Sequence, residues 1–413
     1  MLIRGNPVAA LFGRYKRTPF ELDGAPRFMI ARFTRLPAFL LAVALAAASF
    51  AIAPARAIET PASYVSLMDF ATGEIIYEKQ GNELMAPASM SKLMTMVMLF
   101  DALKDGRVTL DDEFVISENA WRKGGAASGS STMFAELSSR VPVRDLIYGV
   151  IVQSGNDACI AIAEALAGSE ATFAERMTER AREIGLETST FKNSTGWPDE
   201  GHLMTANELA ILARYLIETH PEFYEIYSVR DFEWNGITQA NRNPLIYMNM
   251  GADGLKTGHT SVSGYGLTAS AVRNGRRLVL VVNGLSSEKE RANETQRLMD
   301  WAFREFRSYN LLEAGQVLER APVWQGSSRT VPMVIATDVA LTMSRDARKG
   351  MEAKVRYDGP LTAPIAEGDI IGQLVVTGPG LPTRTYDLQA GTSVEALGMF
   401  GKAMSALAQL ISG

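Results

Sequence analysis

The sequence has 413 residues, of which 47% are hydrophobic and 21% are charged, so it can bury a sizeable core and is expected to form two domains. Eight Lys or Arg and two Asp or Glu fall within the first 57 residues, which leaves 33 basic and 44 acidic side chains and a net charge of −11 for the remainder. An acidic body argues against nucleic acid as a partner.

The basic excess at the start of the chain is typical of an export signal. Arginines precede an apolar stretch over residues 36–53, and the stretch ends in Ala55-Arg56-Ala57, a small-x-small cleavage pattern. We therefore expect residues 1–57 to be leader and signal peptide, with cleavage near Ala57 and an exported mature protein that begins at Ile58. The leader is unusually long, which points to Met29 as the true start. The alternative is an uncleaved anchor, but eighteen alanine-rich residues are at the short limit for spanning a membrane.

Residues 64–80 predict two strands around a turn at 71–73. The next segment, 88–103, is apolar on nearly every face, which is typical of a buried core helix. Its polar side chains therefore need partners from elsewhere in the chain. Positions three apart share a helix face, so Ser89 should lie beside Lys92, while Ser91 points elsewhere.

Pro87 suits the entry to this helix and places Ser89 near the N-terminus, where the helix dipole favours developing negative charge. The alternative interpretation is structural: Ser89 caps the helix and Lys92 extends its amine to solvent. The segment by itself leaves both interpretations open, because a short S-x-x-K match is common by chance.

Three further features follow in chain order. Residues 124–134 form a Gly/Ser loop, and residues 141–168 read as two helical runs interrupted at Ser154-Gly155-Asn156. Apolar runs within 264–285 then flank a tight hairpin turn. This pattern predicts that Lys256-Thr257-Gly258 lies at the start of a strand.

The last third of the sequence changes character. From about Leu311, short alternating segments separated by Gly and Pro predict a small all-β domain over residues 311–391. Helical spacing returns over residues 392–413, with apolar residues on one face, so an amphipathic helix is expected there. This helix either packs on the β domain or lies on the inner membrane surface, and we favour the membrane.

Other chemistry is limited by composition. Cys159 is the only cysteine, so no intramolecular disulfide can form, and it is expected to pack as a small buried hydrophobe. The three histidines are scattered without the spacing of a metal site, and no G-x-S-x-G motif is present. We expect no metal and no cofactor. A serine enzyme built from this chain would need lysine as its base.

Three short motifs, Ser89-x-x-Lys92, Ser154-Gly155-Asn156 and Lys256-Thr257-Gly258, occur in this order with separations of 65 and 102 residues. In order and spacing they resemble the serine penicillin-recognising enzymes. The sequence is most similar to the low-molecular-mass D-alanyl-D-alanine carboxypeptidases of the penicillin-binding protein 5 type, peptidase family S11. The resemblance implies an α/β fold over residues 58–310, with an antiparallel sheet flanked by helices and a helical lobe.

The resemblance also implies roles for the motif residues. Ser89 would be the nucleophile and Lys92 its base, while Ser154 would relay a proton to the leaving amine and Asn156 would bind the substrate amide. A lysine with an ordinary pKa of ~10.4 is protonated at neutral pH, so Lys92 can act as a base only if burial and a nearby cation lower that pKa. Lys256 is the expected cation, and it would also hold Ser154 in place.

Recognition of the substrate falls to the third motif and its neighbours. Lys256, Thr257 and Arg242 would bind the terminal carboxylate, and Gly258 belongs to the same substrate-binding strand. The backbone N–H groups of Ser89 and His259 would form the oxyanion hole. For Arg242 a surface ion pair is an equally open interpretation.

These roles predict a carboxypeptidase that removes the terminal D-alanine from peptidoglycan stem peptides and is covalently inhibited by β-lactams. The alternatives are a DD-endopeptidase that cleaves cross-links, a class A-like β-lactamase and a non-catalytic cell-wall binding protein. A class A β-lactamase uses a glutamate and an asparagine on a loop. Residues 185–202 contain Glu187 and Asn193 without that spacing. Slow hydrolysis of the penicilloyl-enzyme is therefore expected.

Overall fold

The computed structural model describes residues 58–399 and Gly401. Two compact units are present, one formed by residues 59–307 and one that begins at Ser308. Each unit has its own hydrophobic core, as expected for a chain of this length. The predicted leader, residues 1–57, lies outside the described residues.

The N-terminal unit is built on one antiparallel sheet with the strand order β2-β1-β9-β8-β7. Its strands are β1 Tyr64–Asp69, β2 Ile75–Lys79, β7 Ala252–Thr260, β8 Gly264–Arg273 and β9 Arg276–Leu285. Strand β1 therefore pairs with β9, the last strand of this sheet in the chain, and β2 and β7 are the edge strands. The predicted antiparallel sheet and both predicted hairpins are confirmed.

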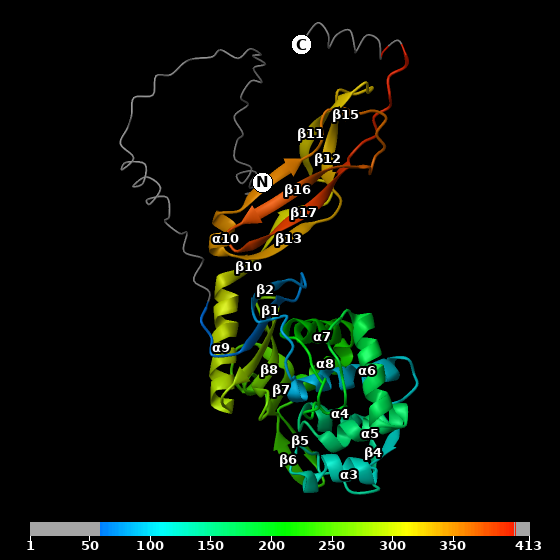
Figure 1. The fold of residues 1–413 in the computed structure, drawn as a ribbon, viewed down its shortest axis with the longest axis vertical. Coiled ribbons are helices and arrows are strands. Elements are labelled where there is room, and N and C mark those ends of the chain that lie inside the picture. The colour runs from blue at the N-terminus through cyan, green and yellow to red at the C-terminus, as the bar shows by residue number, and fades with distance from the viewer. Residues whose placement is uncertain (1–57, 400, 402–413) are drawn as a thin grey trace, which may run out of the picture. The chain divides into compact units, whose positions relative to one another are not determined.

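Helices cover both faces of this sheet (Figure 1). Helix α7, Ala206–Thr219, packs on β1, β8 and β9, and helix α9, Glu288–Glu305, packs on β8 and β9 from the other side. The central residues of β8 and β9 are consequently buried on both faces, which explains their continuous apolar pattern.

The remaining elements form the helical lobe and its small hairpins. The helices are α2 Lys92–Lys104, α3 Glu118–Gly124, α4 Val143–Ile151, α5 Asn156–Ala167, α6 Glu170–Ile184 and α8 Pro221–Tyr224. The short 3-10 helices are η2 Ala88–Ser91, η3 Ala126–Ser128, η4 Glu225–Ser228 and η5 Pro244–Tyr247. Strand β3 Glu113–Val115 pairs with β4 Arg140–Pro142, and β5 Asp231–Trp234 pairs with β6 Ile237–Ala240.

The predicted core helix over 88–103 is present, with one difference at its start. Residues 88–91 form the 3-10 helix η2, and the α-helical part begins at Lys92. Nine of the thirteen residues of α2 are buried, as its apolar surface predicts. The helix therefore brings Lys92 into the interior of the unit.

The C-terminal unit is rich in β structure, as predicted. Its larger sheet has the order β14-β16-β17-β12-β11-β15, and β10 pairs separately with β13. The strands are β10 Phe306–Leu312, β11 Val317–Trp324, β12 Thr330–Ile335, β13 Val339–Ser344, β14 Glu352–Arg356, β15 Leu361–Thr362, β16 Ile370–Gly378 and β17 Leu381–Ala390. One short helix, α10 Arg345–Lys349, interrupts the predicted all-β pattern.

The helix predicted over residues 392–413 does not begin where its spacing indicated. Val394 is buried and forms a β-bridge with Ile365, while Ala396 forms a bridge with Gly326. Residues 394–398 therefore extend along the β unit, and the prediction of helix there is wrong. An apolar residue such as Val394 can be buried in a β-bridge as well as on the face of a helix, so the apolar pattern alone does not distinguish the two. Residues 402–413 lie outside the described residues.

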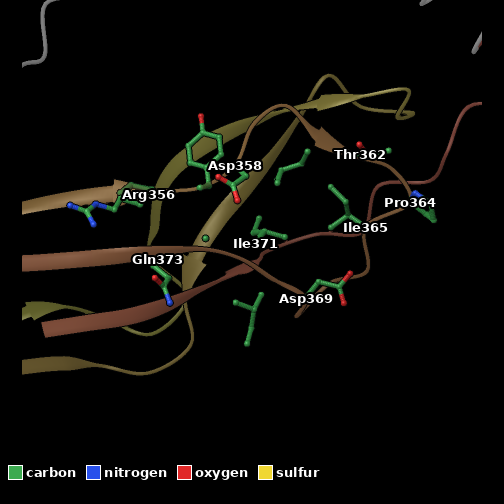
Figure 2. Close-up of a pocket in the computed structure, with 13 residues that line it drawn as sticks. Arg356, Asp358, Thr362, Pro364, Ile365, Asp369, Ile371 and Gln373 are labelled. Carbon is green, nitrogen blue, oxygen red and sulfur yellow. The ribbon is translucent and has the colours of Figure 1, made fainter.

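A pocket in the C-terminal unit lies between residues 355–365 and the start of β16 (Figure 2). Its polar lining includes Arg356, Asp358 and Gln373, together with the apolar side chains of Ile365 and Ile371. None of the predicted site residues belongs to it, because all of them lie in the N-terminal unit.

Candidate active site

The first two motif residues meet at the start of the buried helix. Ser89 lies in η2, which follows Pro87, and Lys92 begins α2. The Lys92 Nζ atom lies 2.8 Å from Ser89 Oγ, as the three-residue spacing predicts. Ser91 faces away, is fully buried, and donates to the Ala88 carbonyl over 3.0 Å. Of the two serines, only Ser89 is paired with the amine.

Lys92 is surrounded by oxygen acceptors. Besides Ser89, its Nζ contacts Asn156 Oδ1 at 2.7 Å and the Thr195 carbonyl oxygen at 2.5 Å. These two oxygens can only accept, so in the neutral amine they take both N–H groups. The lone pair then faces Ser89 Oγ, which is the geometry that a general base needs.

The pKa of Lys92 is lowered to about 8, mainly by burial. Arg242 is a cation whose charge lowers it further. Burial and the Lys92 charge hold the pKa of Lys256 well below its ordinary value, so the two amines repel each other when both are charged. The two buried amines therefore disfavour each other's protonation, and a neutral Lys92 becomes accessible near physiological pH.

Ser154 and Lys256 form the second pair. The Lys256 amine donates to Ser154 Oγ over 2.9 Å, and both side chains are buried. Ser154 has a φ of +62°, a left-handed conformation that costs a non-glycine residue ~1–3 kcal/mol and that clusters at functional sites. It lies two residues before Asn156, the first residue of α5. Asn156 accepts from Lys92 at Oδ1 and donates from Nδ2 to Ser130 Oγ over 3.0 Å.

The third motif lies in the middle of β7, and the prediction that it starts a strand is wrong. Strand β7 begins at Ala252, four residues before Lys256, because the pairing with β8 extends to that point. A Cβ atom on Gly258 would lie 2.9 Å from the Pro87 carbonyl oxygen. Only a glycine lets the edge strand approach η2 this closely, so Gly258 sets the distance between Thr257, His259 and the serine.

A loop that the sequence analysis did not assign completes the surroundings of Lys92. Asn193 Oδ1 accepts hydrogen bonds from the backbone N–H groups of Thr195, Gly196 and Trp197. This turn aims the Thr195 carbonyl at Lys92. Gly196 has a φ of +76°, and a Cβ there would lie 2.0 Å from the Ala88 carbonyl oxygen. The Asn-x-x-Gly spacing was the available signal.

A second unassigned residue, Asp157, fixes the Gly/Ser loop. Its carboxylate accepts from Thr132 Oγ1 and from two backbone N–H groups of the loop over 2.7–3.1 Å. The loop in turn presents Ser131, whose Oγ accepts from Arg242 Nη1 over 2.5 Å. Arg242 is exposed and makes no ion pair with any residue between 58 and 399, so the ion-pair interpretation is wrong.

Acyl transfer needs an activated nucleophile, a proton donor for the leaving group and a surface that holds the substrate. The two hydroxyl–amine pairs and the adjacent edge of β7 can supply these three parts. Residues 51–287 match the family model described as D-alanyl-D-alanine carboxypeptidase, and residues 306–396 match the C-terminal domain of penicillin-binding protein 5. The chain belongs to the D-alanyl-D-alanine carboxypeptidase family. It is a serine-type carboxypeptidase of the penicillin-binding protein 5 type, as the motifs predicted.

Two relatives of this carboxypeptidase cover 93% and 75% of its length. D-alanyl-D-alanine carboxypeptidase DacA of Haemophilus influenzae is 36% identical over 397 residues, which is 93% of this chain and 99% of the relative. DacD of Escherichia coli is 38% identical over 75% of this chain and 80% of the relative.

Among solved structures, penicillin-binding protein 5 from Haemophilus influenzae is 35% identical, with a TM-score of 0.70 over 82% of this chain and 98% of that protein. Penicillin-binding protein D2 from Listeria monocytogenes, solved in the ampicillin-bound form, is 27% identical, with a TM-score of 0.52 over 60% of this chain and 98% of that protein. These likenesses confirm the predicted fold class, and the family match favours the carboxypeptidase over the β-lactamase and the non-catalytic alternatives.

Cys159 of the carboxypeptidase is a free, fully buried residue, as predicted. Burial raises the pKa of its thiol to about 12, so the thiolate form is strongly disfavoured. His202 is also buried, and its Nδ1 accepts from the Lys192 backbone N–H. Both residues have a structural place in the helical lobe.

Proposed function

We propose that this carboxypeptidase releases the terminal D-alanine of peptidoglycan pentapeptide stems through an acyl-enzyme on Ser89. The contact of Lys92 Nζ with Ser89 Oγ and two acceptor-only oxygens carries this proposal. In the first step the Ser89 hydroxyl gives its proton to neutral Lys92 while Oγ attacks the carbonyl carbon of the penultimate D-alanine. The oxyanion is held by the backbone N–H groups of Ser89 and His259.

The leaving amine needs a proton when the C–N bond breaks. The Ser154 hydroxyl donates it, and Lys256, which donates to Ser154 Oγ, replaces it. Free D-alanine departs and an ester to Ser89 remains. Before hydrolysis, Lys92 loses the proton that it took from Ser89 and Lys256 regains the one that it gave, so both amines return to their starting states. Water then attacks the ester carbonyl and gives a proton to Lys92, and Lys92 passes that proton to Ser89 Oγ as the ester bond breaks.

Substrate recognition falls to the strand edge and its surroundings. Asn156 binds the peptide amide, while Thr257 and Lys256, with Gly258 between the strand and η2, hold the end of the substrate beside Ser89. Arg242 releases Ser131 and turns to the terminal carboxylate. A DD-endopeptidase activity on cross-links remains the second candidate, because both reactions break the bond after a D-alanine.

β-Lactams are the expected covalent inhibitors. The relative from Listeria monocytogenes was solved with ampicillin and with cefotaxime bound. In this chain the same attack by Ser89 opens the lactam ring, and the amine stays tethered to the acyl group, so hydrolysis of the product is slow. No catalytic Glu–Asn pair is placed on the loop that carries Asn193, whose amide oxygen is occupied by backbone N–H groups.

The proposed location is the periplasm, after cleavage near Ala57. Within residues 58–399, no helix is long and apolar enough to cross a membrane. We propose that the segment after residue 401 provides attachment to the inner membrane surface through its apolar residues.

The decisive experiment compares the mature protein with Ser89→Ala and Ser91→Ala. We expect unmutated protein and Ser91→Ala to release D-alanine from a peptide ending in D-alanyl-D-alanine, and to gain the mass of one penicillin. Ser89→Ala should do neither. Ser91 is the matched control because it is a buried serine two residues away whose hydroxyl binds only the Ala88 carbonyl. Release of D-alanine by Ser89→Ala would overturn the proposal.

A further inference from the structure

The pocket in the C-terminal unit takes no part in the chemistry proposed for the N-terminal unit. Its volume is about 880 Å³, within the range of ordinary ligand sites. Seven of its thirteen lining residues are exposed, so it is an open groove in the surface and not an enclosed cavity. This shape suits one face of a chain-like ligand better than a small molecule that must be surrounded.

The pocket forms where strand β14 ends before its neighbour β16. The pairing of these two strands stops at Arg356 and Gln373, so residues 370–372 of β16 extend beyond it. A Cβ atom on Gly372 would lie 2.8 Å from the Arg356 carbonyl oxygen and 3.0 Å from Tyr357 Cβ. Gly372 therefore lets the chain after β14 approach β16 closely, and Tyr357 becomes a half-buried side chain in the wall of the pocket.

Several polar groups of the pocket have no protein partner. Neither Tyr357 nor Asp358 forms a side-chain hydrogen bond or an ion pair with any residue between 58 and 399. The Gln373 Nε2 atom donates to Asp387 Oδ1 over 3.3 Å, a long hydrogen bond, and the Gln373 side-chain oxygen is left free to accept. These groups can reach solvent, so a ligand can take the place of the water that they bind.

The side chains of the pocket match the chemistry of an N-acetylated amino sugar. One face of a sugar ring carries C–H groups that pack on an aromatic ring such as Tyr357. The N–H of an acetamido group suits the Asp358 carboxylate, which only accepts, and its carbonyl suits the Gln373 amide. Figure 2 shows these two polar side chains around Ile371, on which the acetamido methyl group can pack.

Two other classes of ligand fit this pocket less well. A peptide that adds to β16 as a strand needs a regular row of backbone groups, but the pairing of β16 shifts register between Ile370 and Gly372. A polyanion needs an excess of basic side chains, whereas the lining contains one arginine and two aspartates. The pocket therefore favours an uncharged ligand that is recognised by side chains.

We propose that this pocket binds chains of N-acetylated amino sugars and so holds the enzyme on the glycan of peptidoglycan. The choice of polymer rests on the proposed function, because these glycan chains carry the stem peptides on which Ser89 is proposed to act. Figure 2 shows Asp358 and Gln373 toward one end of the pocket. Thr362 and Asp369 lie toward the other end, so more than one sugar unit can be contacted.

The first test titrates the mature protein with chitotetraose, four linked N-acetylglucosamine units without a peptide, and measures Kd by ligand-observed NMR. Binding is expected. Tyr357→Ala should raise Kd about three- to tenfold, because the ring that packs on the sugar is lost. Tyr357→Phe keeps the ring and should retain most of the affinity. Asp358→Asn should raise Kd about fivefold, since a charged hydrogen-bond acceptor becomes a neutral amide.

Asp346→Asn is the matched control, because Asp346 is an exposed aspartate of the same unit that lies outside the pocket and pairs with Lys349. Its Kd should equal that of the unmutated protein. Tyr357 also packs on the core of the unit, so Tm is recorded for every variant, and the exposed Asp358 gives a test that does not depend on that packing. Absence of binding, equal Kd values for Asp358→Asn and Asp346→Asn, or equal affinity for maltotetraose, which lacks acetamido groups, would overturn the inference.

The second test sediments the Ser89→Ala protein with insoluble peptidoglycan, whose stem peptides this variant should not consume. Adding Asp358→Asn should raise the unbound fraction about threefold, and chitotetraose should compete for binding. If a soluble peptide ending in D-alanyl-D-alanine displaced the protein completely and chitotetraose had no effect, the polymer would be held through its peptides and the inference would be wrong.

The proposed function is tested separately by D-alanine release from the same soluble peptide. Release by the unmutated protein without chitotetraose binding would refute the glycan site alone. Chitotetraose binding that Asp358→Asn weakens, without any release of D-alanine, would refute the proposed function and support the glycan site.

Discussion

Lys256 Nζ and Ser154 Oγ lie 2.9 Å apart, although 102 residues separate them in the chain. One belongs to the edge strand β7 and the other to the turn before α5. Their contact joins the sheet to the helical lobe beside the Ser89–Lys92 pair. The Ser89–Lys92 pair can supply the nucleophile and its base. The Lys256–Ser154 pair can supply the proton that the leaving amine needs.

Ser154→Ala tests the second half of that reaction. Without the hydroxyl, the leaving amine has no positioned proton donor, so we expect kcat for D-alanine release to fall about 10²- to 10⁴-fold. The measurement is steady-state release, with circular dichroism to verify folding. Ser139→Ala is the control, because Ser139 Oγ donates to the Glu136 carbonyl in an exposed turn and contacts no site residue. Normal turnover by Ser154→Ala would contradict the assigned role.

The pH dependence of acylation follows from the lowered pKa of Lys92, about 8. Below that pH the amine holds a proton and cannot accept one from Ser89, so the rate should rise with pH and level off above about 8. The profile is measured by stopped-flow, as the rate at which a chromogenic β-lactam acylates the free enzyme at each pH. Lys92→Arg stays protonated throughout the range and should remain inactive. A flat profile between pH 6 and 9 would rule out Lys92 as the base.

The Asn193 loop is tested by two glycines that both have positive φ. Gly201→Ala introduces only backbone strain, about 1–2 kcal/mol, because the nearest neighbour is the flexible end of Lys192. Gly196→Ala adds a clash with the Ala88 carbonyl and Ser91 Oγ. We expect Gly196→Ala to be less stable in urea by about a further 1–3 kcal/mol and to lose most acylation activity. Equal behaviour of the two variants would show that the close approach to Ala88 has no consequence.

Two truncations distinguish the C-terminal residues that stabilise the β unit from those proposed to bind the membrane. Removal of residues 402–413 should leave the Tm of the C-terminal unit unchanged and release the protein from the membrane fraction. Removal of residues 394–413 should also lower that Tm, because Val394 is a buried member of the β core. If the shorter truncation stayed with the membrane, attachment by this segment would be refuted.

Several features could be predicted from the sequence because local geometry decides them. The three-residue spacing puts Ser89 beside Lys92 on any helical turn, and the contact is present at 2.8 Å. The all-round apolar surface predicted that α2 would be buried, and alternation with turn residues predicted the hairpins. Family resemblance supplied the fold and the carboxypeptidase activity. Helix and strand periods are properties of the backbone, so they can be read from one segment at a time.

Other features depend on segments that are remote in the chain. Packing between such segments decides the burial that lowers the pKa of Lys92, the aim of the Thr195 carbonyl at its amine and the extended path of Val394. The spacing at 394–398 fits a helix equally well, and only the bridge to Ile365 decides against it. Burial and Coulomb interactions act through space, so a sequence pattern fixes which groups are available, and the tertiary structure decides which of them lose water and meet.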